Sequence, residues 1–187
     1  YLSGCSGDVT AGKYNDGSPD NRVVLADRLY QAMTTAWQET TRLPLKHVGF
    51  RNTSFDLAFN DDQRFSRATL TATLEDADKD VRDRILAAMG LASLDRIAAG
   101  RQIDMPCVEL GPARIVLFPG ETFVGYQLMA QQLQPDNFVM SIGFGECWPG
   151  YIPTRRAFEE NFGHSWRWVA PGADRQLETA LRAVLKE

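Results

Sequence analysis

The chain opens with a polar segment and continues with an apolar pattern of helical period. Residues 1–18 are rich in Gly, Ser, Asp and Asn, which is typical of a loop. Ser18, Pro19 and Asp20 then combine a capping hydroxyl with a proline in the first turn, as helix starts often do. Apolar side chains recur at helical spacing up to about Thr40: Leu25, Leu29, Ala32, Met33, Ala36 and Trp37. The pattern predicts an amphipathic helix.

The rest of the chain alternates between strand and helix patterns. Phe55, Leu57 and Phe59 alternate with polar residues and predict a half-buried strand. Further strands are expected over 103–110, 114–118 and 138–143, with a hairpin turn at Gly111-Pro112 joining the first two. Helical spacing predicts helices around Leu70 and Leu74, over 81–89, 94–99, 121–133 and 155–161, and on Leu177, Leu181, Val184 and Leu185. Together these predict an α/β (mixed α+β) layered fold over residues 1–187, as a single domain or domain fragment.

Composition and charge narrow the function classes. The net charge of −4 and the scattered basic residues argue against nucleic acid, which is bound through clustered Lys and Arg. No apolar run approaches the ~20 residues that a transmembrane helix needs. Cys5, Cys107 and Cys147 fit neither a metal-binding spacing nor a disulfide framework. Whether one disulfide forms or all three thiols stay free is open, and so is the redox compartment.

Glu121 is the first candidate for chemistry. It follows an apolar strand that the Pro119-Gly120 pair interrupts, and a predicted helix follows it. An acid in that place can simply stabilise the helix N-terminus, through the dipole and the free backbone N–H groups. In layered α/β sheets, however, the ends of strands are also where ligand sites collect. Both interpretations stay open on the residues alone.

Three other stretches offer weaker candidates. Tyr151 closes a loop of glycines and prolines, "GFGECWPGYIPT", and is by itself typical of a packed tyrosine unless a cation lowers its pKa. The small residues around Asp8, in "SGCSGDVT", let the backbone come close to a ligand but are equally a common turn composition. His47 and His164 are too few and too far apart in sequence to make a metal site alone. Trp166 and Trp168, next to His164, favour a packing role.

Taken in order, these stretches resemble one family. "GCSGDV" near the start, "FPGE" after a strand, "GYIPT" and then "APG" before a closing helix are similar to the C-terminal part of the catalytic domain of the neutral/alkaline (non-lysosomal) ceramidases. The resemblance is strongest from Met105 to the end and at residues 3–10. Members of that family are zinc amidases that cleave the N-acyl bond of ceramide.

The resemblance implies a metal site with a defined set of ligands. Carried over residue by residue, the family's zinc-binding glutamate matches Glu121 in "FPGE" and its zinc-binding tyrosine matches Tyr151 in "GYIPT". The two remaining ligands in the family are histidines from the first half of the domain. They are therefore expected outside this chain, upstream of Tyr1, and the chain would be the C-terminal portion of a larger domain whose N-terminal part is missing.

Two positions depart from the family pattern. The family's catalytic serine, in a pattern like S-N-x-G-D-x-S-P-N, aligns with Gly4 when Gly7-Asp8 is placed on the Gly-Asp pair. A second active-site tyrosine of the family falls on Gly163, where the neighbouring His164 is the polar candidate to replace it. Gly4, Asp8 and His164 are accordingly expected to form the pocket, with Glu121 and Tyr151 as metal ligands. The substrate stays open.

The resemblance thus predicts a zinc-dependent hydrolase of an amide-type bond, ceramidase-like, acting on a small-molecule or lipid-like substrate such as an N-acylated lipid. With serine absent, metal-bound water is the expected nucleophile. One alternative is a non-catalytic member of the fold that binds a lipid-like or glycan-like ligand or a partner protein. A third interpretation is structural, with Glu121 as a helix cap and Tyr151 as a core residue.

Overall fold

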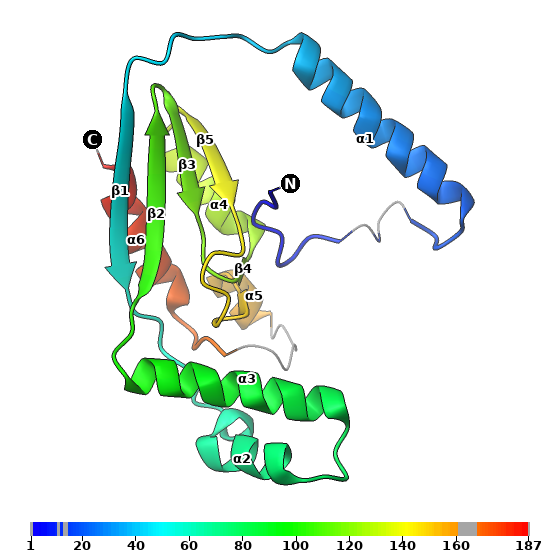
Figure 1. The fold of residues 1–187 in the computed structure, drawn as a ribbon, viewed down its shortest axis with the longest axis vertical. Coiled ribbons are helices and arrows are strands. Elements are labelled where there is room, and N and C mark those ends of the chain that lie inside the picture. The colour runs from blue at the N-terminus through cyan, green and yellow to red at the C-terminus, as the bar shows by residue number, and fades with distance from the viewer. Residues whose placement is uncertain (1, 11, 13–14, 161–167, 187) are drawn as a thin grey trace.

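The computed structural model describes residues 2–10, 12, 15–160 and 168–186 (Figure 1). Its centre is a four-stranded sheet in the order β1-β2-β3-β5. The strands are β1 (Val48–Phe55), β2 (Ile103–Leu110), β3 (Ala113–Leu117) and β5 (Phe138–Ile142). Strand β2 runs antiparallel to both of its neighbours, β1 and β3, whereas β5 runs parallel to β3, so the sheet is mixed. The predicted mixed α/β fold is confirmed.

One face of the sheet carries the main core. Along β2, alternate residues from Ile103 to Glu109 are buried, as expected of a strand with one covered face. Helix α6 (Ala173–Leu185) and helix α4 (Val124–Leu133) pack on this face and lie behind the sheet as drawn in Figure 1. Leu177 and Leu181 of α6 are fully buried there, and burying a leucine side chain contributes about 1.5–3 kcal/mol. This packing fixes which face of each strand points inward.

A smaller apolar cluster lies at one end of the sheet. The 3₁₀ turn η2 (Gln63–Phe65), helix α2 (Arg67–Glu75) and helix α3 (Val81–Ala98) surround Trp168, which stacks on Phe59 and meets Phe65 edge-on. Asp80 caps α3 by accepting a hydrogen bond from Arg82 N. The predicted packing role of Trp168 is confirmed. Trp166 lies outside the described residues.

Helix α1 (Asp20–Gln38) confirms the predicted N-terminal helix, but the predicted cap by the Ser18 hydroxyl was wrong, because the N-cap residue is Pro19 and no side chain caps the helix. None of its residues is buried, and Figure 1 shows it apart from the sheet and from the α2–α3 pair. Its apolar stripe therefore has no core to face in this structure. Within the described residues, no helix combines the length and hydropathy that a membrane span requires.

Several predicted boundaries were wrong. A strand was expected at Phe55, Leu57 and Phe59, but strand β1 lies earlier in the chain and stops at Phe55, which pairs with Ile103. Phe59 makes only an isolated bridge to Val169. The helices expected over 81–89 and 94–99 are one helix, α3, which runs through Gly90. Gly90 lies against Leu70 and Trp168, where a larger side chain would not fit without a shift.

The third boundary concerns the helix expected over 121–133. It begins at Val124, because residues Glu121–Thr122 form a short strand, β4, instead of a first helical turn. The hairpin at Gly111-Pro112 and the C-terminal helix are confirmed, and so is the strand expected over 138–143, which ends at Ile142. Helix α5 (Arg155–Glu159) is shorter than the range predicted.

Candidate functional site

Glu121 and Tyr151 are placed side by side by a small two-stranded ladder. After β3, Phe118 N still donates to Ile142 O at 2.7 Å, and the chain then turns at Pro119-Gly120. Strand β4 (Glu121–Thr122) pairs in parallel with β6 (Tyr151–Ile152), and Glu121 is the register partner of Tyr151. Parallel register partners project their side chains from the same face of a ladder. The two predicted metal ligands are therefore brought together.

The two side chains also interact. The Tyr151 hydroxyl donates a hydrogen bond to the Glu121 carboxylate. Burial raises the pKa of Tyr151 above its ordinary value of 10.0, and the hydrogen bond to Glu121 and the negative charge of Glu121 raise it further. The phenol is thus held as a neutral donor facing a carboxylate. An opposing cation at this point would favour the phenolate instead.

The turn that carries Glu121 is tightly constrained. Gly120 has a φ of +52° and lies against the Gly150 carbonyl, so a side chain would not fit there. Glu121 N donates to Gly150 O at 2.8 Å, and Gly120 N donates to Glu146 O at 2.9 Å. Backbone hydrogen bonds therefore join the 119–122 and 143–151 loops, and they fix the position of the Glu121 backbone.

Phe144, in the second loop, has the left-handed backbone that a non-glycine residue rarely adopts, with φ of 62°. Its N–H donates to Gly120 O at 3.0 Å, which holds the conformation in place. Strained residues of this kind cost about 1–3 kcal/mol and cluster at functional sites. The sequence did not predict this backbone conformation, because "GFGE" is typical of an ordinary glycine-rich loop.

The N-terminal segment crosses both loops. Gly143 N donates to Ser3 O at 2.8 Å, and Gly7 N donates to Thr122 O at 3.2 Å. Residues 3–8 thus run from the end of β5 to β4 and lie directly against the Glu121 backbone. The third predicted stretch is brought to the same place as the other two.

Gly4 and Asp8 have distinct surroundings within that segment. A Cβ on Gly4 would lie 3.0 Å from Oε1 of Gln127, a residue of α4 that the sequence reasoning did not single out. Asp8 Oδ1 accepts a hydrogen bond from Val124 N at 2.7 Å. The cap of α4 is therefore Asp8, delivered from a distant segment, and the capping role considered for Glu121 was wrong. The pocket-forming roles of Gly4 and Asp8 stay predictions.

The two histidines do not join this pair within the described residues. His47 lies at the hairpin end of β2 and β3, where its Nε2 is 3.4 Å from Glu109 Oε2. Glu109 is buried, and its Oε1 lies 2.8 Å from Arg51 Nε. Glu121 follows the other end of β3, so His47 is not a partner for it. His164 lies outside the described residues.

The residues present could supply two ligands of a metal site. Glu121 and Tyr151 offer two oxygen donors of the kind that Zn²⁺ or a harder cation accepts. Across the described part of the chain, no three His, Cys, Asp or Glu side chains gather where they could hold a metal ion. Two converging donors fit a metal whose other ligands come from elsewhere, and they do not by themselves fit a complete structural site.

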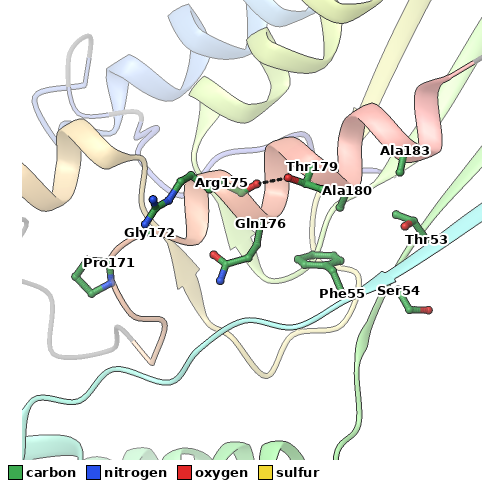
Figure 2. A pocket seen from close by; sticks show the side chains of 10 residues that line it. All are labelled: Thr53, Ser54, Phe55, Pro171, Gly172, Arg175, Gln176, Thr179, Ala180 and Ala183. Atoms are coloured by element: carbon green, nitrogen blue, oxygen red, sulfur yellow. Dashed lines mark hydrogen bonds between the residues drawn. The ribbon is translucent and has the colours of Figure 1, made fainter.

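A cavity of about 410 Å³ lies elsewhere, between β1 and α6. Figure 2 shows Phe55 on its strand side and Gln176 and Thr179 on its helix side. The Thr179 hydroxyl donates to the Arg175 carbonyl within α6 at 2.8 Å, so it is not aimed at a ligand. None of the predicted site residues lines this cavity. The cavity and the Glu121–Tyr151 pair are separate features.

Comparisons with known proteins support the fold and leave the chemistry open. No protein-family model matches the sequence, and no curated protein sequence matches it. The structure is similar to the crystal structure of neutral ceramidase from Pseudomonas aeruginosa, with a TM-score of 0.57 and 11% sequence identity. The match covers 96% of this chain and 35% of the ceramidase chain. This chain therefore spans about a third of that protein's length and shares the fold of that part.

Proposed function

We propose that this chain is part of a zinc-dependent hydrolase of an amide-type bond, with an N-acylated lipid as the substrate class. The observation that carries the proposal is the alignment of Glu121 with Tyr151 in the β4–β6 ladder. The similarity of fold to neutral ceramidase supports it, because that likeness spans nearly the whole chain.

Glu121 and Tyr151 would hold the metal. A zinc ion, when bound, polarises a carbonyl and lowers the pKa of its bound water to ≈ 7. Glu121 would contribute its negative charge, and Tyr151 would give up its hydroxyl proton, because a metal ligand must be deprotonated. The effect of Glu121 on the pKa of Tyr151 supports the proposal, because it requires the two side chains to lie close together. Two further ligands, expected as histidines, would come from outside this chain.

The Gly4–Asp8 segment would form one wall of the pocket. It lies against the Glu121 backbone, and the absence of a side chain at Gly7 lets the two backbones pass that closely. Backbone N–H groups of such a segment can stabilise an oxyanion when they point at it. Gly4 at the family's serine position leaves water as the nucleophile. The chain would therefore rely on the metal site for its chemistry.

A non-catalytic ligand-binding protein is the second candidate, and the cavity between β1 and α6 favours it. Its volume of about 410 Å³ falls in the range of small-molecule sites, and it does not involve Glu121 or Tyr151. In that case a lipid-like or glycan-like ligand would bind to a fold that had lost its metal. Binding would then be insensitive to substitution of Glu121.

The test uses the protein encoded by the complete gene. Glu121→Gln and Tyr151→Phe should each lower the bound zinc and the hydrolysis of an N-acyl sphingosine together, by tenfold or more in order of magnitude. Glu159→Gln and Tyr30→Phe are matched controls on exposed positions and should change neither. Thermal unfolding of every variant shows that folding is retained. Unchanged zinc content in both site variants would end the hydrolase proposal.

A further inference from the structure

The second face of the sheet is apolar and uncovered. Register partners across the four strands share a face, and two complete rows of them contain only apolar residues. The first row is Val48, Leu110, Ala113 and Phe138, and the second is Phe50, Val108, Ile115 and Met140. We call these eight residues the open face.

The open face is more exposed to solvent than is usual for a surface made of apolar side chains. Phe50 is 69% exposed and Phe138 65% exposed, whereas Ile103, Met105 and Val116 on the opposite face are completely buried. A sheet with one solvated face normally alternates apolar with polar residues, and sheets with apolar residues on both faces are covered on both. A contiguous apolar patch of this kind marks an interaction surface.

A polar border ends the open face on one side. Asn52 Nδ2 and Ser54 Oγ both donate to Asp104 Oδ1, at 2.9 and 2.6 Å. Asn52 and Ser54 lie two and four positions after Phe50 along β1, and Asp104 of β2 is the register partner of Ser54. All three residues therefore belong to the same face as Phe50. An apolar centre with a hydrogen-bonded polar rim is the usual anatomy of a protein interface.

Helix α1 presents a second exposed apolar surface, and a short linker connects it to the open face. It buries no residue, and Leu29, Met33 and Trp37 lie at i, i+4 and i+8 on one stripe, with Trp37 78% exposed. In proteins most of the stability of a helix comes from packing its apolar face against other elements. The linker after α1 carries Leu43 and Leu45, which border a hollow of about 310 Å³ against Leu110, Ala113 and Phe138. The linker thus borders the open face and connects it to α1, which itself stands away from the sheet.

We propose that the open face and the apolar stripe of α1 pack against a second β-sheet, contributed by the remaining polypeptide of the ceramidase-like domain. The identity of this polypeptide rests on the proposed function, since it is the part expected to supply the missing metal ligands. The comparison supports the existence of such a polypeptide, because 65% of the ceramidase chain has no counterpart here (100% less the 35% covered). Stacked sheets lie ≈ 10 Å apart, which suits the aromatic and branched side chains of the open face.

The position of the open face fits this occupant. Strands β3 and β5 carry half of the face, and the loops that follow them carry Glu121 and Tyr151. A layer over the face therefore ends beside the Glu121–Tyr151 pair, where its strand-end loops can approach it. One docking event would cover the apolar surface and complete the site.

Hydroxyl-radical footprinting tests the proposal on two proteins, the 187-residue chain and the protein encoded by the complete gene. In the isolated chain, Phe50, Phe138, Met140 and Trp37 should be modified readily. In the complete protein, the same residues should be protected several-fold. Leu128 of α4, which is 49% exposed on the other side of the sheet, is the internal control and should react equally in both.

Variants separate docking from metal binding. Phe50→Lys with Phe138→Lys should leave the melting temperature of the isolated chain nearly unchanged, because both side chains are exposed there. The same pair should lower the melting temperature of the complete protein, whereas Leu128→Lys should not. Glu121→Gln should retain the protection of the open face even if zinc is lost, so failure of the metal proposal does not imply failure of this one.

Three outcomes would overturn the proposal. Protection of the open face in a monomer of the isolated chain would mean that α1 folds back over it. Protection that accompanies a dimer, measured by sedimentation, would assign the face to a second copy. Equal reactivity in the isolated chain and the complete protein would mean that nothing covers it.

Discussion

Glu121 and Tyr151 are register partners in a parallel ladder of only two residues per strand, although thirty positions separate them in the chain. Two loops bring them together: one leaves β3 and the other leaves β5, and these strands are themselves parallel neighbours. The ladder is short, but backbone hydrogen bonds from Gly120, Glu121 and Phe123 extend it on both sides. The pair is consequently a property of the sheet topology.

The pairing predicts a shift in the titration of Tyr151. Burial raises its pKa first, and the hydrogen bond and charge of Glu121 add to the effect. Glu121→Gln removes the charge, so the pKa of Tyr151 should fall toward its ordinary value of 10.0 while burial keeps it above. The measurement is the phenolate absorbance of the parent minus that of Tyr151→Phe, repeated in the Glu121→Gln background. An unchanged midpoint would show that the two side chains do not interact.

The same shift has a consequence for stability against pH. The folded protein holds the Tyr151 proton more tightly than the unfolded chain does. The resulting contribution to the free energy of unfolding is therefore fully present below the unfolded pKa of ≈ 10. It is lost as the pH rises through the higher folded pKa. Urea unfolding of the parent at increasing alkaline pH should show this loss, and Tyr151→Phe should show less of it.

Asp8 is expected to matter for stability through the start of α4. Asp8→Ala leaves Val124 N without its acceptor and should cost about 1 kcal/mol, the usual value of a lost helix cap. Asp8→Asn keeps a side-chain oxygen and should stay close to the parent. Urea unfolding of the three proteins measures the differences. If Asn is as damaging as Ala, the charge of Asp8 has a role beyond the cap.

Gly7 is required by the close passage of two backbones. An alanine Cβ at this position would clash with the Glu121 carbonyl and lie 2.8 Å from Phe123 Cδ1. Gly7→Ala should therefore destabilise by about 1–3 kcal/mol, as overpacking does. Gly12→Ala is the control, because its Cβ would meet nothing closer than 3.7 Å. Equal stability of the two variants would show that the N-terminal segment is not held against Glu121.

The three cysteines are all free and should differ sharply in reactivity. Burial and the nearby charge of Asp8 raise the pKa of Cys5 to about 12, and burial also raises that of Cys107. Thiolates are the reactive form, so these two should resist alkylation in the folded protein. Cys147 is exposed and should react alone. Mass spectrometry should count one modification before unfolding and three after, and Cys147→Ser should abolish the first.

Local patterns were sufficient for most of the elements and insufficient for their ends. The sequence was sufficient to predict α1, α6 and the β2–β3 hairpin, because apolar residues recur at regular spacing in the two helices and a Gly-Pro turn joins the two strands. The end of β1 was not, since Phe55, Leu57 and Phe59 alternate as a strand would, and only the extent of β2 decides where pairing stops. Gly90 concealed the continuity of α3 for a similar reason: the packing of Trp168 demands it.

The candidate site divides in the same way. The residue types at Glu121 and Tyr151, and the breaks at Pro119-Gly120 and in "GECWPGY", are written in the sequence, and so is the order of the motifs. Their adjacency is not, because it depends on β5 pairing beside β3 across an intervening helix. The capping role of Asp8 was invisible for the same reason, since its acceptor oxygen meets a helix more than a hundred residues away.

Alone, the sequence determined the mixed α/β class, most of its helices and strands, and the two oxygen-bearing residues that could hold a cation. These follow from side-chain chemistry and from periods set by the backbone, both of which are local. Tertiary structure decided that the two residues meet, that Asp8 caps α4, and that one face of the sheet is left open. Those facts depend on which strands pair and which faces are covered, and that is fixed only when distant segments compete to bury their apolar surface.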